Sequence, residues 1–438
     1  MSTSRSFEID VEERLIRLTG RGVQLGMERI SRLLLLLENP QQSLAVIHVG
    51  GTNGKGTTSQ LIAEVLTASG YRVGRFTSPH LHSYRERFVI DGTMIPAERL
   101  AAYLDQMQNL TADWPEEDLP TEFEILTAIM FLYFYEEAVD YVVLEVGMGG
   151  IYDSTNCIIP LVAVVTSVDL DHVAFLGSDL ASIAWNKAGI IKSQVPVVIG
   201  KLHKEARTVI EAAAVKAEAA LLSGEAVTIQ GVKPCFPGQI VNITGGGWQF
   251  SQINFNLSGS YQRDNLAVAL MTLGELRKQG ILIPDQAILT VLSRINIPGR
   301  MEILAQKPLV LCDVAHNPHG VAALASSLAE WFPEQRYVLL LSIVDDKDKS
   351  AMIAPLGKMA RLAVVTRPDG HRNLRWRETT EIFHGLYPQT EVVEAEDIAT
   401  AVDLALSELQ SDEYLLITGS FYLMDQARSE VLRKFGSR

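Results

Sequence analysis

The chain has 438 residues, of which 47% are hydrophobic and 21% are charged, and its formal net charge at pH 7 is −14. This length is more than one ordinary hydrophobic core holds, so we expect two domains, and the composition excludes an intrinsically disordered protein. The negative charge argues against general attraction to nucleic acid or to an anionic membrane, and we expect neither as a partner.

The N-terminus and the longest apolar run bear on the cellular location. The first fifteen residues carry acids where a signal peptide would carry basic residues, and the run Leu33–Leu37 is far shorter than the roughly 20 residues that cross a bilayer. We therefore expect a cytoplasmic protein. Cys157, Cys235 and Cys312 suit neither a disulfide framework nor a zinc site, and we expect them to be buried and unreactive.

Short apolar runs rich in β-branched residues alternate with helical patterns in the first half of the chain. These runs do not alternate with polar residues, as expected of parallel strands covered on both faces, and they lie within residues 44–50, 140–147, 160–167 and 195–200. Helical spacing predicts a helix over residues 57–70, and a second over 122–138 that is apolar nearly all round and therefore buried. The alternation predicts a doubly wound α/β sheet.

The pattern changes after residue 225. Short strands and glycines predict a small antiparallel element over residues 225–257, and a pair of helices is expected over 262–280 and 284–296. Strand and helix then alternate again, with apolar runs within residues 308–315, 336–342, 360–367 and 413–419. We therefore expect an α/β protein with a mostly parallel first domain over residues 1–297, followed by a smaller Rossmann-like α/β domain over 298–438.

The stretch VIHVGGTNGKGTT, residues 46–58, is a strand, a glycine-rich loop and the start of a helix, which is an arrangement that surrounds phosphate groups. It departs from the usual G-x-x-x-x-G-K-[ST] loop because only three residues separate Gly50 from Gly54, and Gly56 follows the lysine. Lys55 would offset phosphate charge and Thr57 would offer its hydroxyl to Mg²⁺. A plain glycine turn is the alternative, but the lysine and hydroxyl together favour nucleotide binding.

Two further strand ends carry polar side chains. Glu145 ends one buried strand, and Asp169, Asp171 and His172 follow the next. Ligands of open α/β sheets bind beyond the carboxyl ends of the strands, so Lys55, Glu145 and His172 together predict a metal site. A strand-end glutamate or a lone histidine can also be an ordinary hydrogen-bonding residue, and that alternative stays open.

Several motifs occur in a fixed order between about Gly22 and Leu423: GGTNGKGT, TSPHL, EVGMGGIYDSTN, LDHVAFLG, KAGIIK, PGR and DVAHNP. Together they resemble those of folylpolyglutamate synthase and the bifunctional dihydrofolate synthase, in the Mur ligase superfamily, whose phosphate-binding loop is similarly shortened. The resemblance implies that ATP phosphorylates a substrate carboxylate and that the amino group of L-glutamate attacks the acyl phosphate. The implied acceptor is dihydropteroate or a reduced folate, and we expect the enzyme to be a monomer.

The resemblance also implies roles for individual residues. The implied ATP-binding residues are Gly51, Thr52, Asn53, Gly54, Lys55, Gly56, Thr57, Asn265, Arg300 and Asp313. One or two Mg²⁺ ions would be held by Thr57, Ser78, Glu145, His172 and Lys187, the last of which matches a lysine that this family carbamylates. The residues placed at the reacting groups are Lys55, Lys187, Arg300 and His316.

The pterin side of the substrate would be held by two short segments. Their residues are Thr121, Glu122, Phe123 and Glu124, and Asp153, Ser154 and Thr155. The first segment is also a good helix cap and the second a good turn.

The sequence departs from the family at three positions. Ile151 and Tyr152 stand where relatives usually have an Arg-Leu pair, and Asn186 replaces a glutamate before the lysine that is carbamylated. Two alternatives therefore stay open: a Mur-type ligase for another carboxylic acid and amino acid, and a nucleotide-binding switch without acyl chemistry. For Lys187, pairing with a carboxylate at a helix end is the alternative to carbamylation.

Overall fold

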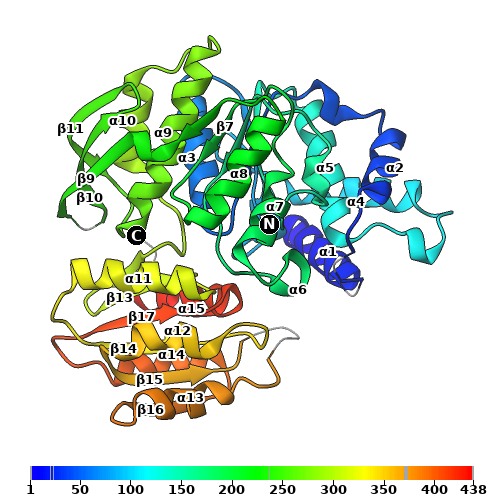
Figure 1. Ribbon diagram of the computed structural model, residues 1–438. Coiled ribbons are helices and arrows are strands. Elements are labelled where there is room, and N and C mark those ends of the chain that lie inside the picture. The colour runs from blue at the N-terminus through cyan, green and yellow to red at the C-terminus, as the bar shows by residue number, and fades with distance from the viewer. Residues whose placement is uncertain (1, 20, 23, 236, 369–372, 437–438) are drawn as a thin grey trace. The chain divides into compact units, whose positions relative to one another are not determined.

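The computed structural model describes residues 2–19, 21–22, 24–235, 237–368 and 373–436 (Figure 1). The chain forms two compact units, which interleave in sequence. The first contains Met1–Ile229, Asn242–Ser251 and Asp264–Ser293, and the second contains Gln230–Val241, Gln252–Arg263 and Arg294–Arg438. The domain boundary expected between residues 297 and 298 stays a prediction.

The first unit is built on an eight-stranded sheet with the order β4-β3-β2-β5-β1-β6-β7-β8. From β2 to β8 the strands are parallel, whereas β3 is antiparallel to β2 and β4 to β3. The strands are β1 (Val46–Gly50), β2 (Val73–Phe76), β3 (Phe88–Ile90), β4 (Thr93–Met94), β5 (Tyr141–Glu145), β6 (Val162–Val165), β7 (Val197–Ile199) and β8 (Leu221–Ser223). This sheet confirms the predicted mostly parallel architecture and adds the short strands β2, β3, β4 and β8.

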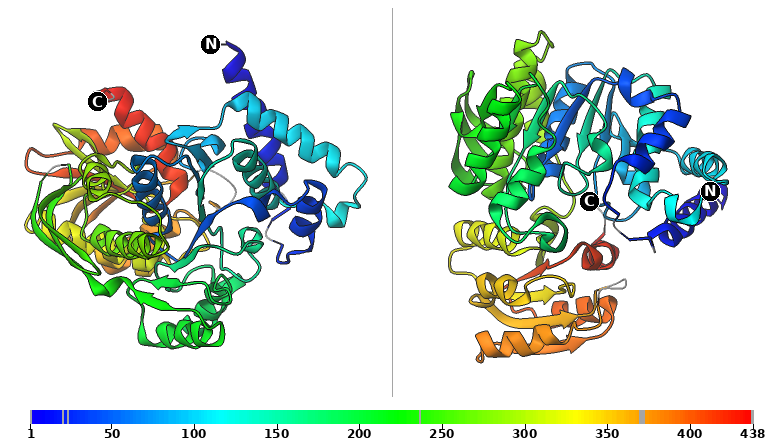
Figure 2. Two further views of the ribbon diagram at one scale, coloured as in Figure 1. Left: turned by 90° about the horizontal axis from the view of Figure 1, so that it is seen from above. Right: turned by 45° about the vertical axis from the view of Figure 1, so that its right-hand side comes forward.

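Helices cover the strands of this unit, which lie between helical layers in Figure 2. Its helices are α1 (Ser2–Thr19), α2 (Glu28–Leu36), α3 (Lys55–Ala68), α4 (Ala97–Leu110), α5 (Glu122–Glu136), α6 (Val173–Leu176), α7 (Leu180–Ala188) and α8 (Lys204–Lys216). The predicted buried helix is α5, whose apolar side chains share one hydrophobic cluster with Val46, Phe76 and Leu144 of the sheet. Helices α7 and α8 form a second cluster with β6 and β7.

A smaller β element and a helical pair follow, as the sequence predicts. The three-stranded sheet has the order β11-β10-β9 and consists of β9 (Val227–Pro234), β10 (Gln239–Gly245) and β11 (Trp248–Phe255). The helices are α9 (Tyr261–Lys278) and α10 (Asp285–Arg294).

The second unit contains a six-stranded sheet with the order β12-β13-β17-β14-β15-β16, in which only β12 is antiparallel to its neighbour among the described strands. The strands are β12 (Glu302–Gln306), β13 (Leu309–Asp313), β14 (Tyr337–Leu341), β15 (Ala360–Thr366), β16 (Glu391–Ala395) and β17 (Tyr414–Thr418). The helices are α11 (Pro318–Trp331), α12 (Lys349–Gly357), α13 (Glu378–Leu386), α14 (Ile398–Ser407) and α15 (Phe421–Phe435). The predicted Rossmann-like α/β architecture is confirmed.

One expectation about the cysteines is wrong. All three are free thiols, but only Cys312 is buried, while Cys157 and Cys235 are half-buried. Cys157 follows a short 3₁₀ turn and Cys235 follows the end of β9, so both lie outside the central strands, where burial is most complete.

Among the described helices, none is long and apolar enough to cross a membrane.

Candidate functional site

The loop between β1 and α3 has a backbone that only glycine can adopt at two positions. Gly51 has φ +140° and Gly54 has φ +85°, both in the left-handed region. A Cβ on Gly51 would lie 2.0 Å from Thr166 Oγ1, and one on Gly54 would lie 2.2 Å from Asn265 Oδ1. The side chain of Asn265, from α9, therefore lies directly against this loop.

The end of β6 fixes the same loop by hydrogen bonds. The backbone N–H of Thr52 donates to Ser167 O at 2.9 Å, and that of Asn53 donates to Ser167 Oγ at 2.9 Å. The Thr166 hydroxyl donates to Asn53 O at 2.6 Å. The loop is thus held in one shape by the neighbouring strand before the first turn of α3 begins.

Lys55, Glu145 and Ser78 meet beside this first turn. Lys55 Nζ lies 4.0 Å from Glu145 Oε1 and 3.2 Å from Thr52 O, and the backbone N–H of Ser78 donates to Glu145 Oε2 at 3.4 Å. Glu145 is buried at the carboxyl end of β5, and Thr57 is buried in the first turn of α3. A buried carboxylate beside a lysine and two hydroxyl-bearing residues is a donor set that suits phosphate and a hard cation.

The residues expected to hold magnesium supply mainly oxygen atoms. Mg²⁺ is usually bound through one or two carboxylates together with phosphate oxygens and water, so Glu145, Ser78 and Thr57 fit it chemically. His172 precedes α6, is exposed and has φ +50°. In the described part of the chain, no group of three or more His, Cys, Asp and Glu side chains is placed to hold a metal ion. The magnesium site therefore stays a prediction.

Lys187, at the end of α7, is 3% exposed and donates from Nζ to Gly51 O at 2.9 Å. Burial, and secondly the charge of Lys55, lower the pKa of Lys187 to about 7, against opposing effects of Asp171, Asp169 and Asp153. Its amine is therefore partly neutral near neutral pH. The neighbouring residue in α7, Asn186, is also buried.

Asn186 packs against the double glycine that follows β5. A Cβ on Gly149 would lie 2.5 Å from Asn186 Oδ1, and one on Gly150 would lie 2.6 Å from Asn186 O. The backbone N–H of Ile151 donates to the same carbonyl oxygen at 3.1 Å. Asn186, one of the positions expected to depart from the family, thus contacts the glycines and Ile151 that precede the segment expected to bind substrate.

That segment, Asp153–Thr155, surrounds a buried carboxylate. Asp153 accepts hydrogen bonds from the backbone N–H of Met148 at 2.8 Å, from the backbone N–H of Thr155 at 3.0 Å and from the Thr155 hydroxyl. Burial raises the pKa of Asp153, and these hydrogen bonds oppose the rise. Ser154 Oγ lies 3.2 Å from Thr127 Oγ1, which joins the segment to α5.

The segment Thr121–Glu124 begins α5 with a capping box, so the helix-cap interpretation of this sequence is confirmed. Glu124 Oε2 accepts from Thr121 N at 2.8 Å, from Thr121 Oγ1 at 2.9 Å and from Arg29 Nε at 3.0 Å. Glu122 pairs with Arg87 at 3.7 Å. Glu124 Oε1 is buried and has no hydrogen-bond partner among the residues that the structure describes.

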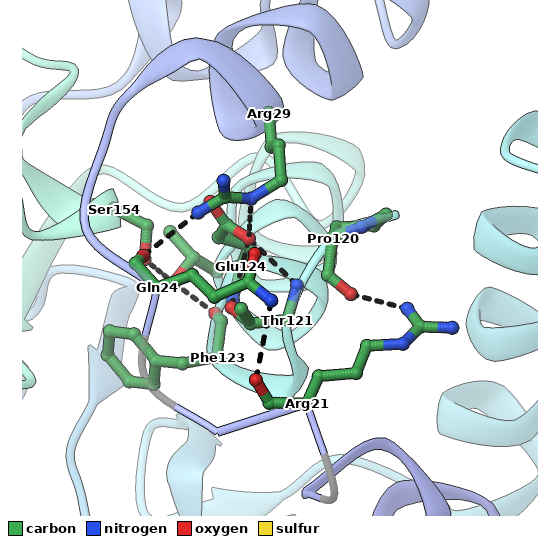
Figure 3. Close-up of polar contacts among 9 residues, drawn as sticks. Arg21, Gln24, Arg29, Pro120, Thr121, Phe123, Glu124 and Ser154 are labelled. Atoms are coloured by element: carbon green, nitrogen blue, oxygen red, sulfur yellow. Dashed lines mark hydrogen bonds and ion pairs between the residues drawn. The ribbon is translucent and has the colours of Figure 1, made fainter. Parts of the chain in front are cut away.

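Figure 3 shows that side chains from the N-terminal segment point toward the start of α5. Arg21 donates to Pro120 O at 2.6 Å, and Arg29 donates to Gln24 O at 2.9 Å. Sequence reasoning did not find Arg21, Arg29 or Arg87, because nothing in the local sequence of an arginine indicates a partner so far along the chain.

In the second unit, Asp313 ends β13 and is buried. Its Oδ2 accepts from Tyr261 OH at 2.6 Å and from Met301 N at 2.8 Å, and its Oδ1 accepts from Ala315 N at 2.8 Å. Burial raises the pKa of Asp313, and the neighbouring charge of Arg300 opposes this rise.

Arg300 and His316 gather around one aromatic ring of the second unit. The Arg300 guanidinium carbon lies 5.6 Å from the centre of the Phe421 ring, and the His316 ring centre lies 5.2 Å from it. His316 Nδ1 is 2.9 Å from Val314 O. The second unit therefore brings its three predicted site residues, Arg300, Asp313 and His316, into one region.

The chain matches two family models, the Mur ligase middle domain over residues 49–273 and the Mur ligase, glutamate ligase domain over residues 299–421. It is 34% identical over 432 residues to the dihydrofolate synthase/folylpolyglutamate synthase of Bacillus subtilis, which covers 94% of this chain and 96% of that protein. The chain belongs to the folylpolyglutamate synthase and dihydrofolate synthase family of Mur ligases. It is also 35% identical over 414 residues to the folylpolyglutamate synthase of Lacticaseibacillus casei, covering 92% of this chain and 94% of that one.

Solved structures of this family have the same fold. Mycobacterium tuberculosis folylpolyglutamate synthase complexed with ADP gives a TM-score of 0.89 at 32% identity, covering 99% of both chains. E. coli FolC in complex with DHPP and ADP gives a TM-score of 0.85 at 28% identity, covering 97% of this chain and 98% of that one. These comparisons confirm both the resemblance drawn from the sequence motifs and the α/β fold class.

Proposed function

We propose that the protein is an ATP-dependent ligase that adds L-glutamate to dihydropteroate, to a reduced folate or to both through an acyl phosphate. The observation that carries this proposal is the meeting of Lys55, Glu145 and Ser78 at a shortened phosphate loop, in a chain that matches both Mur ligase domains. Relatives whose solved structures contain ADP support ATP as the nucleotide.

The chemistry requires two anions, the substrate carboxylate and the γ-phosphate, to come together. Lys55 would offset part of this negative charge, and the backbone N–H groups of the rigid loop would bind phosphate oxygens. Mg²⁺, held by Glu145, Ser78, Thr57, His172 and Lys187, would supply the remaining positive charge when bound. The carboxylate oxygen attacks the γ-phosphorus, ADP leaves, and the glutamate amine then displaces phosphate to form the amide.

Arg300, Asp313, His316 and Asn265 are proposed to serve the nucleotide and the reacting groups. Asp313 is fixed by three hydrogen bonds, so its orientation is set before ATP binds. The Arg300 guanidinium adds a cation that suits a phosphate group, and Asn265 lies against Gly54 of the loop.

Carbamylation of Lys187 is proposed as well. In this reaction the ammonium first loses a proton, and the neutral amine nitrogen then attacks the carbon of CO₂ and loses a second proton, so a cation becomes an anion overall. The buried position of Nζ at the phosphate loop and the lowered pKa of Lys187 support it, because only the neutral amine can attack. The carbamate would offset the repulsion that a plain ammonium would exert on Mg²⁺.

For the pterin side of the substrate, we propose the segments Thr121–Glu124 and Asp153–Thr155. The buried, unpaired Glu124 Oε1 is an acceptor suited to an N–H group, and Phe123 is a flat apolar side chain beside it in the sequence. DHPP in the E. coli relative supports a pterin-type ligand. A cytoplasmic location, a monomeric state and the absence of nucleic-acid and membrane partners stay predictions.

A ligase for another carboxylic acid is the second candidate. Ile151 favours it, because relatives usually have an arginine there and its loss removes a positive charge near the substrate. A nucleotide switch is less favoured, since the chain matches the glutamate ligase domain as well as the middle domain.

A paired assay tests the proposal. Phosphate release from ATP is measured with glutamate and either dihydropteroate or tetrahydrofolate, while circular dichroism checks the fold. We expect glutamate-dependent release with at least one of the two. A folded protein that releases no phosphate with either would contradict the proposal. Thermal stabilisation by a panel of carboxylic acids, with a non-hydrolysable ATP analogue present, would then identify another acceptor.

A further inference from the structure

His48 is a fully buried histidine in the middle of β1. It pairs in register with Leu144 of β5 and Ala163 of β6, so it lies on the central strand of a sheet that is otherwise apolar at this level. Side chains alternate along a strand, so His48 points to the same face as Val46, which packs in the cluster that contains α5. None of the proposed chemical steps uses this histidine.

The His48 side chain connects to the segment expected to bind substrate through one hydroxyl group. His48 Nε2 lies 2.9 Å from Thr155 Oγ1, and the Thr155 hydroxyl is hydrogen-bonded to Asp153 Oδ1. Asp153 Oδ2 accepts from the backbone N–H of Met148 at 2.8 Å. Hydrogen bonds thus connect three side chains in series, from His48 on the strand that precedes the phosphate loop, through Thr155, to the buried carboxylate of Asp153.

The direction of each proton follows from the donors present. Burial raises the pKa of Asp153, whereas the two backbone N–H groups that it accepts and the charge of Lys55 oppose this rise and favour the ionised carboxylate. We take Asp153 as ionised, and an ionised carboxylate can only accept. The single hydroxyl proton of Thr155 is therefore donated to Asp153. The Thr155 oxygen must then accept from His48, so the imidazole carries its proton on Nε2.

The other ring nitrogen, Nδ1, is buried and has no hydrogen-bond partner among the described residues. An unpaired buried polar atom is unfavourable, and an apolar side chain in β1 would avoid that cost. Burial, followed by the charge of Lys192, also lowers the pKa of His48 to about 3. The ring is therefore neutral and donates from Nε2. The hydrogen bond to Thr155 is the contact that histidine makes and that an apolar side chain at this position could not make.

We propose that His48 is a positioning residue for substrate binding: its Nε2–H group fixes the Thr155 hydroxyl, which in turn orients the Asp153 carboxylate. The inference rests on the proposed function, and it adds a residue of β1 to the determinants of pterin-substrate affinity. Because His48 acts through Thr155 and Asp153, its loss affects the pterin substrate and leaves ATP binding nearly unchanged.

Three substitutions of His48 in the full-length protein test this role. A glutamine amide nitrogen can occupy nearly the place of Nε2, an asparagine amide nitrogen reaches only the place of Nδ1, and leucine has no donor. We expect His48→Asn and His48→Leu to raise KM for the pterin substrate about tenfold, a change within the range of the net contribution of one hydrogen bond. KM for ATP should change by less than about twofold, and His48→Gln should restore most of the pterin affinity.

Thermal unfolding of each variant shows whether it folds, and nitrogen-15 NMR of the imidazole gives a second measurement that needs no turnover. The His48 signals, assigned by their loss in His48→Gln, should show a proton on Nε2 and no titration between about pH 5 and 8. A proton on Nδ1, a glutamine variant as impaired as the leucine variant, or equal rises in KM for ATP and pterin would overturn the inference. Failure of the wild-type protein to turn over either pterin substrate would contradict the proposed function, and the tautomer would still decide the hydrogen-bond direction.

Discussion

Replacing Lys55 with methionine removes one positive charge from the phosphate loop while keeping most of the side-chain volume. Two unit charges about 4 Å apart in a partly buried site interact with roughly 4 kcal/mol, which corresponds to about a thousandfold in rate. The Lys55 side chain is only 16% exposed, so the same partly screened setting applies to its interaction with a phosphate group at a similar distance. We expect the rate of phosphate release to fall about a thousandfold, measured under saturating ATP, glutamate and pterin substrate.

The stability of this variant should change little. Lys55 Nζ makes a long pairing with Glu145 and a hydrogen bond to Thr52 O, neither of which organises the core. Lys278→Met, on the exposed end of α9 in the same unit, is the matched control and should keep the normal rate. If Lys55→Met turned over ATP near the normal rate, the phosphate-loop assignment would be wrong; a fall in rate with an equal loss of folded protein would contradict the electrostatic explanation.

Three further predictions concern ion pairing, pH and a buried carboxylate. Arg29→Met leaves the buried Glu124 without its cation, so the free energy of unfolding, measured in denaturant, should fall by about 3 kcal/mol; an unchanged midpoint would show that the pair contributes nothing. The pKa of Lys187 is lowered from 10.5 to about 7, so between these pH values the folded protein binds fewer protons than the unfolded one and stability should rise with pH. In CO₂-free buffer, Lys187→Met should flatten that rise in thermal midpoint, and parallel curves would contradict the lowered pKa. Asp313→Asn cannot accept all three donors that the carboxylate accepts, so it should raise KM for ATP and lower the thermal midpoint, whereas the exposed control Asp412→Asn should do neither.

The sequence was sufficient for the central strands and for the helices α3, α5, α9 and α10, whereas the long helices α1 and α4 were not predicted. The runs at residues 44–50 and 140–147 are rich in β-branched residues and, apart from His48, apolar within the strand until Glu145 ends β5, because both faces of β1 and β5 are covered. Burial therefore leaves a signal in the sequence itself. Strand β4 lies at the sheet edge with β3 beside it, and the two are only two and three residues long, too short for any periodicity. Strand β16 also lies at an edge and carries glutamates that face solvent, which hides it among loop residues.

The candidate site likewise contains residues that a local sequence pattern predicts and residues that it does not. Lys55 and Glu145 could be named from the sequence because a glycine loop and a strand end are local patterns. The partners Arg29 and Glu124 are 95 residues apart, and His48 and Thr155 are 107 residues apart. Only tertiary packing, such as that of α2 against α5, brings such residues together. A histidine inside an apolar strand was the available signal for His48, but its partner had no local signal.

The strand order explains why the carboxyl ends of β5 and β6 lie beside the loop that follows β1. From β1 the chain continues to β2, beyond β5 on one side, whereas from β6 it continues to β7 and β8 on the other side. Ligands of open α/β sheets bind where neighbouring connections leave in opposite directions, because the loops there separate and leave room. The loop after β1 lies at this point. It must therefore adjoin the end of β5, which carries Glu145, and the end of β6, which is followed by Thr166 and Ser167. Changes to the glycines of the loop should therefore disturb nucleotide binding through contacts with both neighbouring strands, which no substitution on an outer strand such as β8 would reproduce.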